Sequence, residues 1–172
     1  MRVAIFIDGI TLFHGLKEMK NQNINFVLLK NWLKEKNNLT SCCYFNATKT
    51  IETKKSFFSH VHKSGFNIYI RKPKKNAFIK KININEMIVE FVLEAIIQKQ
   101  KYDKIIIVSG KHDFLPLCEK LFLLNKKVEI VGFKKNINKV YNKYKQRYLD
   151  DFLKKQGEYF VDGKNGEFIF EK

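Results

Sequence analysis

The clearest signal of the fold is Lys104-Ile105-Ile106-Ile107-Val108-Ser109-Gly110-Lys111-His112-Asp113-Phe114. It begins with a run of β-branched residues, which predicts a buried strand that ends at Ser109-Gly110. Val3–Ile7 is a similar apolar run, and it ends at Asp8. Functional groups in an open α/β sheet lie beyond the carboxyl ends of the strands. We therefore expect Asp8 and Asp113 to lie near each other at one edge of a sheet.

Apolar runs alternate with amphipathic segments along most of the chain, which predicts an α/β fold with a mostly parallel central sheet flanked by helices. The expected strands are Val3–Ile7, Ser41–Phe45, Phe66–Ile70, Lys104–Val108 and Lys127–Val131. The expected helices are Thr11–Lys20, Phe26–Lys36, Thr53–Ser64, Asn85–Lys99 and Phe114–Leu124.

The C-terminal part of the chain has a different pattern. Asn136–Lys155 is expected to be a further helix, and Tyr159–Phe170 is expected to be a terminal hairpin around a Gly-rich turn. We therefore expect an α/β domain over residues 1–135. Residues 136–172 would form a helix and hairpin packed on that same domain.

The chain carries 33 Lys and Arg against 17 Asp and Glu in 172 residues, a formal net charge of +16. Such a charge attracts polyanions from a distance and favours nucleic acid as a partner. Only Arg2, Arg71 and Arg147 are arginine, and the chain is also rich in Asn, Ile and Phe. A bias toward AT-rich codons would produce the same composition, so a merely solvated basic surface is the alternative explanation.

The sequence contains no apolar run near the roughly 20 residues that span a bilayer, and its first apolar run is too short for a signal peptide. Cys42, Cys43 and Cys118 show no metal-binding spacing. We expect them to be small buried residues in a reducing cytosol, and we expect a cytoplasmic protein without a membrane partner.

Two segments resemble the NYN domain family. Ile5-Phe6-Ile7-Asp8-Gly9-Ile10-Thr11-Leu12-Phe13 is similar to the opening of that family, and Ile105 to Leu117 is similar to its strand-Ser-Gly-Asp-Ser-Asp-Phe-x-Pro segment. Lys80–Ile84 and Lys126–Gly132 resemble two further motifs, so the resemblance covers roughly residues 3–133. It implies a PIN-like, Rossmann-type three-layer fold. It also implies a ribonuclease in which clustered acids hold Mg²⁺ or Mn²⁺ to hydrolyse phosphodiester bonds.

The resemblance implies roles for individual acids. Asp8 and Asp113 match the first and last family acids, and both would be catalytic residues and metal ligands. Asn83 stands at a family Asp position, where it keeps an oxygen ligand but loses the charge. The family's helix acid falls on Val89 in strict register. Glu90 would serve as catalytic residue and ligand if the register shifts, with Glu86 as the alternative.

Lys111 departs from the family pattern in the opposite direction, because it replaces the first Asp of the Ser-Gly-Asp-Ser-Asp motif. An ammonium group at that place repels Mg²⁺ and can neutralise Asp8 and Asp113. The formal charge at the matched positions falls from about five negative to two negative and one positive. A metal site of this kind would be weak or empty unless RNA supplied phosphate oxygens.

The residues expected to contact nucleic acid form two sets: Thr11, Ser109, Lys111 and His112 at the site, and Arg71, Lys72 and Lys74 in a basic loop. Structural alternatives exist for most of them. Asp8 and Asp113 could be helix N-caps, and Lys111 could be a solvated loop lysine. Tyr141, Tyr144 and Tyr148 could stack on bases, although aromatic residues at helical spacing are more often part of a core.

The leading hypothesis is a domain that binds single-stranded RNA and cleaves it with Mg²⁺ or Mn²⁺. The alternative is a pseudonuclease that binds RNA or a protein without catalysis, because Lys111 has replaced the metal. A third hypothesis is a scaffold that forms a homodimer through a sheet edge.

Overall fold

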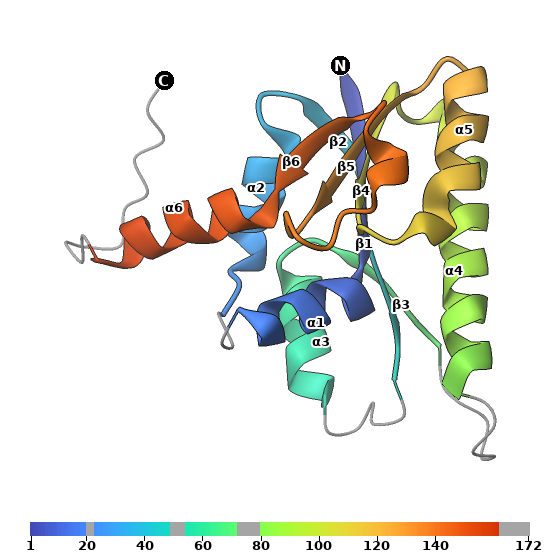
Figure 1. Cartoon of the computed structure of the whole chain (residues 1–172). Helices are drawn as coiled ribbons and strands as arrows, with labels where there is room; N and C mark the ends of the chain where they lie inside the picture. The colour runs from blue at the N-terminus through green and yellow to red at the C-terminus, as the bar shows by residue number, and fades with distance from the viewer. Residues whose placement is uncertain (20–22, 49–53, 72–79, 162–172) are drawn as a thin grey trace.

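The computed structural model describes residues 1–19, 23–48, 54–71 and 80–161, without the side chains of residues 80–85 and 158–161. Its centre is a six-stranded sheet of order β3-β2-β1-β4-β5-β6, in which every neighbouring pair is parallel (Figure 1). The strands are β1 (Arg2–Asp8), β2 (Asn38–Ala47), β3 (Asn67–Arg71), β4 (Lys104–Val108), β5 (Lys127–Gly132) and β6 (Lys145–Tyr148).

Helices cover both faces of this sheet, and side-chain alternation along β1 shows which helix covers which face. Val3, Ile5 and Ile7 pack in one core with α1 (Gly9–Glu18), α2 (Phe26–Lys34), α3 (Lys55–Lys63) and α6 (Leu149–Val161). Ala4 and Phe6 point to the other face, where they pack with α4 (Lys80–Ile97) and α5 (Leu115–Leu123). The expected three-layer α/β, PIN-like fold is therefore confirmed. The described part of the chain also contains the short 3₁₀ turns η3 (Gln98–Gln100), η4 (His112–Phe114) and η5 (Lys139–Tyr141).

The two central strands, β1 and β4, bring the distant sequence motifs together. Both are buried along almost their whole length, as their continuous apolar runs predict for strands covered on both faces. They pair in parallel with Ile7 opposite Val108, so both end at the same edge of the sheet. Asp8 and Ser109 follow directly, and this register places the two motifs side by side.

The C-terminal region differs from the expected helix over Asn136–Lys155. That stretch contains the turn η5 and strand β6, and only its last residues belong to α6. Strand β6 pairs in parallel with β5, with Glu129 opposite Lys145. Its sequence, Lys145-Gln146-Arg147-Tyr148, carries no strand pattern, because an edge strand need not be apolar.

The expected hairpin over Tyr159–Phe170 is wrong at its start, because α6 continues through Val161. Residues 162–170 lie outside the described part of the chain. Helix α4 also begins earlier than expected, at Lys80 rather than Asn85, so Asn83 is a helical residue. The three cysteines are buried free thiols, as expected.

Candidate functional site

Asp8 is the centre of the candidate site at the carboxyl edge of the sheet. It is the last residue of β1 and is completely buried, with 0% exposure. Its Oδ1 accepts hydrogen bonds from the backbone N–H groups of Ile10 and Thr11, both at 3.1 Å. Asp8 is therefore the N-cap of α1, the structural role that the sequence left as an alternative.

The second carboxylate oxygen of Asp8 is also fully engaged. Oδ2 accepts a hydrogen bond from the Thr11 hydroxyl at 2.5 Å and one from the Ser109 hydroxyl at 3.2 Å. The Lys111 ammonium lies 3.3 Å from the same oxygen. An ionised carboxylate offers about four lone-pair positions, and Asp8 already faces five donors. No acceptor position is left at Asp8 for another ligand.

The loop that carries Lys111 is held by residues from the segment before β6. A Cβ atom on Gly110 would lie 2.3 Å from the backbone oxygen of Asn136, so only glycine fits this close approach. The Gly110 oxygen accepts from the backbone N–H of Asn138 at 3.0 Å, and the Lys111 oxygen accepts from the hydroxyl of Tyr141. These contacts fix the backbone of Lys111 next to Asp8.

Tyr141 is thus a supporting residue that sequence reasoning did not assign to the site. Its side chain is completely buried, which agrees with the expectation that Tyr141 belongs to the core. It lies in the 3₁₀ turn η5 rather than in the expected helix. Burial raises the pKa of its hydroxyl, so the group remains a hydrogen-bond donor. Tyr141 follows Lys111 by 30 residues, so no local sequence pattern could indicate this contact.

The other acids expected at the site have basic partners of their own. Asp113 lies in η4, and its Oδ1 is 3.5 Å from Nε2 of His112. Both side chains are exposed, at 39% and 73%. Glu90 lies on α4 and forms an ion pair of 2.9 Å with Arg71 at the end of β3. In the described part of the chain, neither Asp113 nor Glu90 shares a hydrogen bond or ion pair with Asp8.

The remaining candidates are less informative. Asn83 belongs to α4, but its side chain is not described. Glu86 is exposed on the same helix. Lys72 and Lys74 of the basic loop lie outside the described residues. The structure therefore brings Asp8, Thr11, Ser109 and Lys111 into one cluster, whereas Asp113 contacts its neighbour His112 and Glu90 pairs with Arg71.

A divalent metal does not fit this arrangement. Mg²⁺ needs carboxylate oxygens with free lone pairs, whereas both oxygens of Asp8 are engaged and an ammonium group lies beside one of them. Among the side chains that the structure describes, no group of three or more His, Cys, Asp or Glu residues could hold a metal ion. An ion at Asp8 would have to displace Lys111 and at least one hydroxyl donor.

Comparisons with known proteins agree with the fold. No curated protein matches the chain. A solved structure of a protein of unknown function from Vibrio parahaemolyticus is similar, with a TM-score of 0.76 and 19% sequence identity. The match covers 87% of this chain and 93% of that one, and at this identity it supports the fold alone.

The described part of the chain has no helix that combines the length and hydropathy needed to cross a bilayer.

The model of the NYN domain family matches residues 2–153, which is most of the chain and includes every strand of the sheet. The placement among nuclease-like domains that the sequence motifs implied is therefore confirmed: the chain belongs to the NYN domain family.

Proposed function

We propose that this NYN domain binds RNA without a catalytic metal ion, and that Lys111 supplies the positive charge that a metal would otherwise bring. The observation that carries this proposal is the ion pair between Lys111 and Asp8, with Nζ and Oδ2 3.3 Å apart. Asp8 is completely buried, whereas the Lys111 side chain is 32% exposed. The ammonium group thus lies between a buried carboxylate and solvent.

This position suits contact with a phosphate. An ammonium group has three donors, and the described contact with Asp8 uses one of them. A phosphate oxygen in the adjacent solvent could accept a second, charge-assisted hydrogen bond. The net charge of +16 would steer a polyanion toward the protein, and RNA is the partner that family membership favours.

A metal-dependent ribonuclease, the leading hypothesis from sequence, agrees less well with the geometry. Each of the three acids assigned to catalysis has a basic neighbour: Asp8 has Lys111, Asp113 has His112 and Glu90 has Arg71. A metal centre would have to break the ion pairs of Asp8 with Lys111 and of Glu90 with Arg71 before these ligands could converge. Binding of RNA requires no such rearrangement.

Fluorescence anisotropy with labelled single-stranded RNA tests the proposal. We expect the same dissociation constant in EDTA and in Mg²⁺ at constant ionic strength, no cleavage with either, and weaker binding as salt increases. Lys111→Gln should weaken binding about fivefold and lower the salt dependence by about one phosphate contact, while Lys111→Arg should bind nearly as well as the native chain.

Lys101→Gln is the matched control, because Lys101 is an exposed lysine next to η3, away from the Asp8 cluster. It should change RNA affinity less than twofold. Thermal melting of each variant separates loss of binding from loss of folding. Equal effects of Lys111→Gln and Lys101→Gln, or Mg²⁺-dependent cleavage by the native chain, would contradict the proposal.

A further inference from the structure

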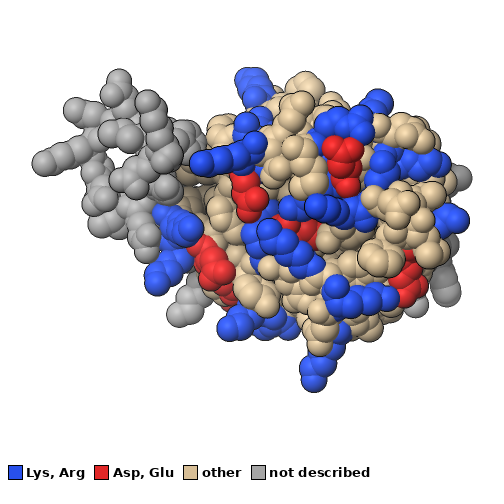
Figure 2. All heavy atoms as spheres, turned by 90° about the horizontal axis from the view of Figure 1, so that it is seen from above, with Lys and Arg blue, Asp and Glu red and all other residues tan. Residues whose placement is uncertain are grey.

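The opposite edge of the sheet carries a groove that the Asp8 site does not use. It has a volume of about 990 Å³ and lies between α5 and the amino-terminal ends of β4, β5 and β6. This edge faces the viewer in Figure 2, where Lys and Arg side chains cover much more of the surface than Asp and Glu. The groove is lined by five lysines: Lys104, Lys126, Lys127, Lys143 and Lys145.

Apolar side chains line the groove between these lysines. Phe122 and Leu123, in the last turn of α5, are 68% and 75% exposed, and both line the groove. Val128 and Tyr144 also contribute to the lining. Adjacent large apolar residues that remain this exposed, with charged residues around them, are typical of an interaction site.

The positive charge of the groove is not balanced by its own acids. Glu119 is the one acid among the lining residues, and it pairs with Lys143 at 3.1 Å. Five lysines and one glutamate give the lining a formal charge of +4, although Lys104 and Lys145 also pair with the buried Glu129, which does not line the groove. The pair of Glu119 with Lys143 also shows that a carboxylate is accommodated at the rim.

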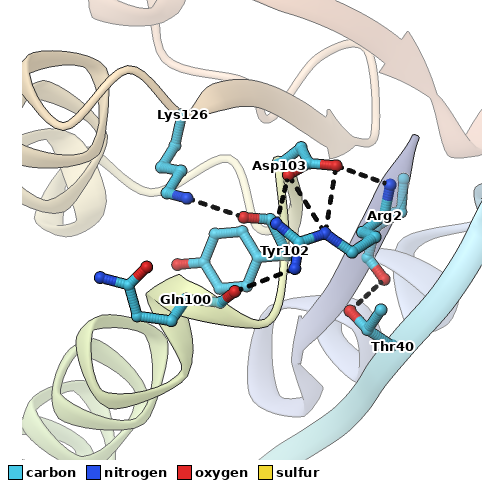
Figure 3. Close-up of polar contacts among 7 residues, drawn as sticks. Arg2, Thr40, Gln100, Tyr102, Asp103 and Lys126 are labelled. Carbon is cyan, nitrogen blue, oxygen red and sulfur yellow. Dashed lines mark hydrogen bonds and ion pairs between the residues drawn. The ribbon is translucent and has the colours of Figure 1, made fainter.

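Neighbouring acids are already engaged. Asp103 accepts hydrogen bonds from the guanidinium and backbone N–H of Arg2, which lies 2.7 Å away at its closest (Figure 3). In the same view, Lys126 donates to the backbone oxygen of Tyr102 at 2.9 Å, and it forms no ion pair within 4.0 Å of an acid in the described part of the chain, although its charge acts on nearby Asp103. Lys127 forms no ion pair with any described residue.

The lining favours a peptide over RNA. None of the residues that line the groove is arginine, the residue that best matches phosphate and base edges. The Lys143 ammonium already lies 5.4 Å from the centre of the Tyr144 ring, which leaves that ring less suited to stacking on a base. Met1, Leu123 and Val128 offer aliphatic surface, which matches apolar side chains.

We propose that this groove docks a segment of a partner protein in which bulky apolar residues are flanked by Asp and Glu. The apolar residues would pack on Phe122 and Leu123, and the flanking carboxylates would pair with Lys126 and Lys127. This interaction does not depend on RNA binding at the Asp8 site, because the two regions lie at opposite edges of the sheet.

A labelled synthetic peptide of about 12 residues, with Phe and Leu flanked by Glu, tests this proposal on the full chain by fluorescence anisotropy. We expect saturable binding that weakens about tenfold in Lys127→Glu and in Leu123→Ser. Both positions are exposed, so neither change should lower the melting temperature appreciably. Lys101→Glu is the charge-matched control and should bind the peptide within about twofold of the native chain.

Two control peptides separate charge from apolar contact. Replacing every Glu by Lys, or every Phe and Leu by Ser, should abolish binding. Lys111→Gln should leave peptide binding unchanged, so failure of the RNA proposal and failure of this one give different results. Equal binding of the Lys-substituted peptide, or displacement of the acidic peptide by single-stranded RNA in a Lys127-dependent way, would overturn the proposal.

Discussion

Asp8, at the carboxyl end of β1, and Glu129, in β5, are both completely buried carboxylates of one sheet, yet their surroundings differ. Asp8 meets a single cation, Lys111, together with two backbone N–H groups and two hydroxyls. Glu129 meets three cations: Lys104, Lys145 and Arg147. Burial of an acid therefore does not identify a metal or catalytic site, because the number and charge of its donors decide what it can still bind.

The two environments also leave different charge at the surface. One ammonium balances Asp8, so the carboxyl edge keeps only the exposed part of Lys111 for a ligand. Three cations exceed the single charge of Glu129, and two of them, Lys104 and Lys145, line the groove at the opposite edge. A buried acid paired with lysine is thus part of a nearly neutral cluster at the carboxyl ends of the strands, and part of a region with excess positive charge at their amino-terminal ends.

Removal of the Glu129 charge should have the largest effect on stability. Burial favours the neutral acid, but the hydrogen bond from Lys104 and the charges of Arg147 and Lys104 outweigh it and hold the pKa of Glu129 below its ordinary value. Glu129→Gln leaves Lys104, which is 7% exposed, without its counter-charge, and leaves Arg147 paired with the more exposed Glu35 alone. We expect a loss of about 3 kcal/mol in the free energy of unfolding by urea.

Glu119→Gln is the matched control for this change. Glu119 also pairs with a lysine, but both side chains are at least half exposed, so the loss should be under about 1 kcal/mol. A similar small loss for Glu129→Gln would contradict the view that the buried ion pairs hold β5 and β6 together with α2. Arg147 makes that connection through the backbone oxygens of Trp32 and Leu33.

Substitution of Asp8 should have the next largest effect and distinguishes the two interpretations of the carboxyl edge. Asp8→Ala removes the N-cap of α1 and the partner of Lys111, so the free energy of unfolding should fall by about 2–3 kcal/mol. Asp8→Asn keeps an oxygen for the cap and should lose about 1 kcal/mol. In a cluster of repelling acids that awaits a metal, removal of one acid would raise stability instead.

Protonation of Asp103 should have the smallest effect. Hydrogen bonds from the Arg2 side chain and backbone lower the pKa of Asp103 to about 2. Because the pKa is lower in the folded chain, the contribution is complete above about pH 4 and is lost as the pH falls toward 2. Asp103→Asn should therefore melt slightly below the native chain at pH 5 and together with it near pH 2. A constant difference across this range would show that the Arg2 contact is not electrostatic.

Sequence reasoning located the strands that are buried on both faces, because such strands consist almost entirely of apolar residues. The continuous apolar runs of β1 and β4 predicted a central parallel sheet, and the structure and family match confirm it. Strand β6 escaped prediction because its pairing with β5 depends on Arg147 and Lys145 meeting a buried glutamate 16 to 18 residues earlier. A contact between charged residues of this kind produces no periodic pattern of hydrophobic residues in the sequence.

The candidate site was predictable to the same limited degree. The ends of β1 and β4 predicted that Asp8 and Asp113 lie near each other, with Lys111 able to neutralise them, because parallel strands end at one edge. The structure shows the contact of Asp8 with Lys111, whereas Asp113 contacts His112. The donors that saturate Asp8 could not be counted from sequence, since hydroxyl and backbone contacts depend on local geometry. The pairing of Glu90 with Arg71 was also hidden, because it joins a helix and a strand that are 19 positions apart.

Binding of Mn²⁺ to the native chain, Lys111→Asp and Lys111→Asn tests most directly whether Lys111 takes the place of a metal. The binding is measured as the shift in melting temperature between EDTA and millimolar Mn²⁺. We expect no metal-dependent shift in melting temperature for the native chain or for Lys111→Asn. Lys111→Asp should be less stable in EDTA and should gain several degrees with Mn²⁺, because it places a second carboxylate beside Asp8. A comparable gain by the native chain would contradict the claim that Lys111 takes the place of a metal.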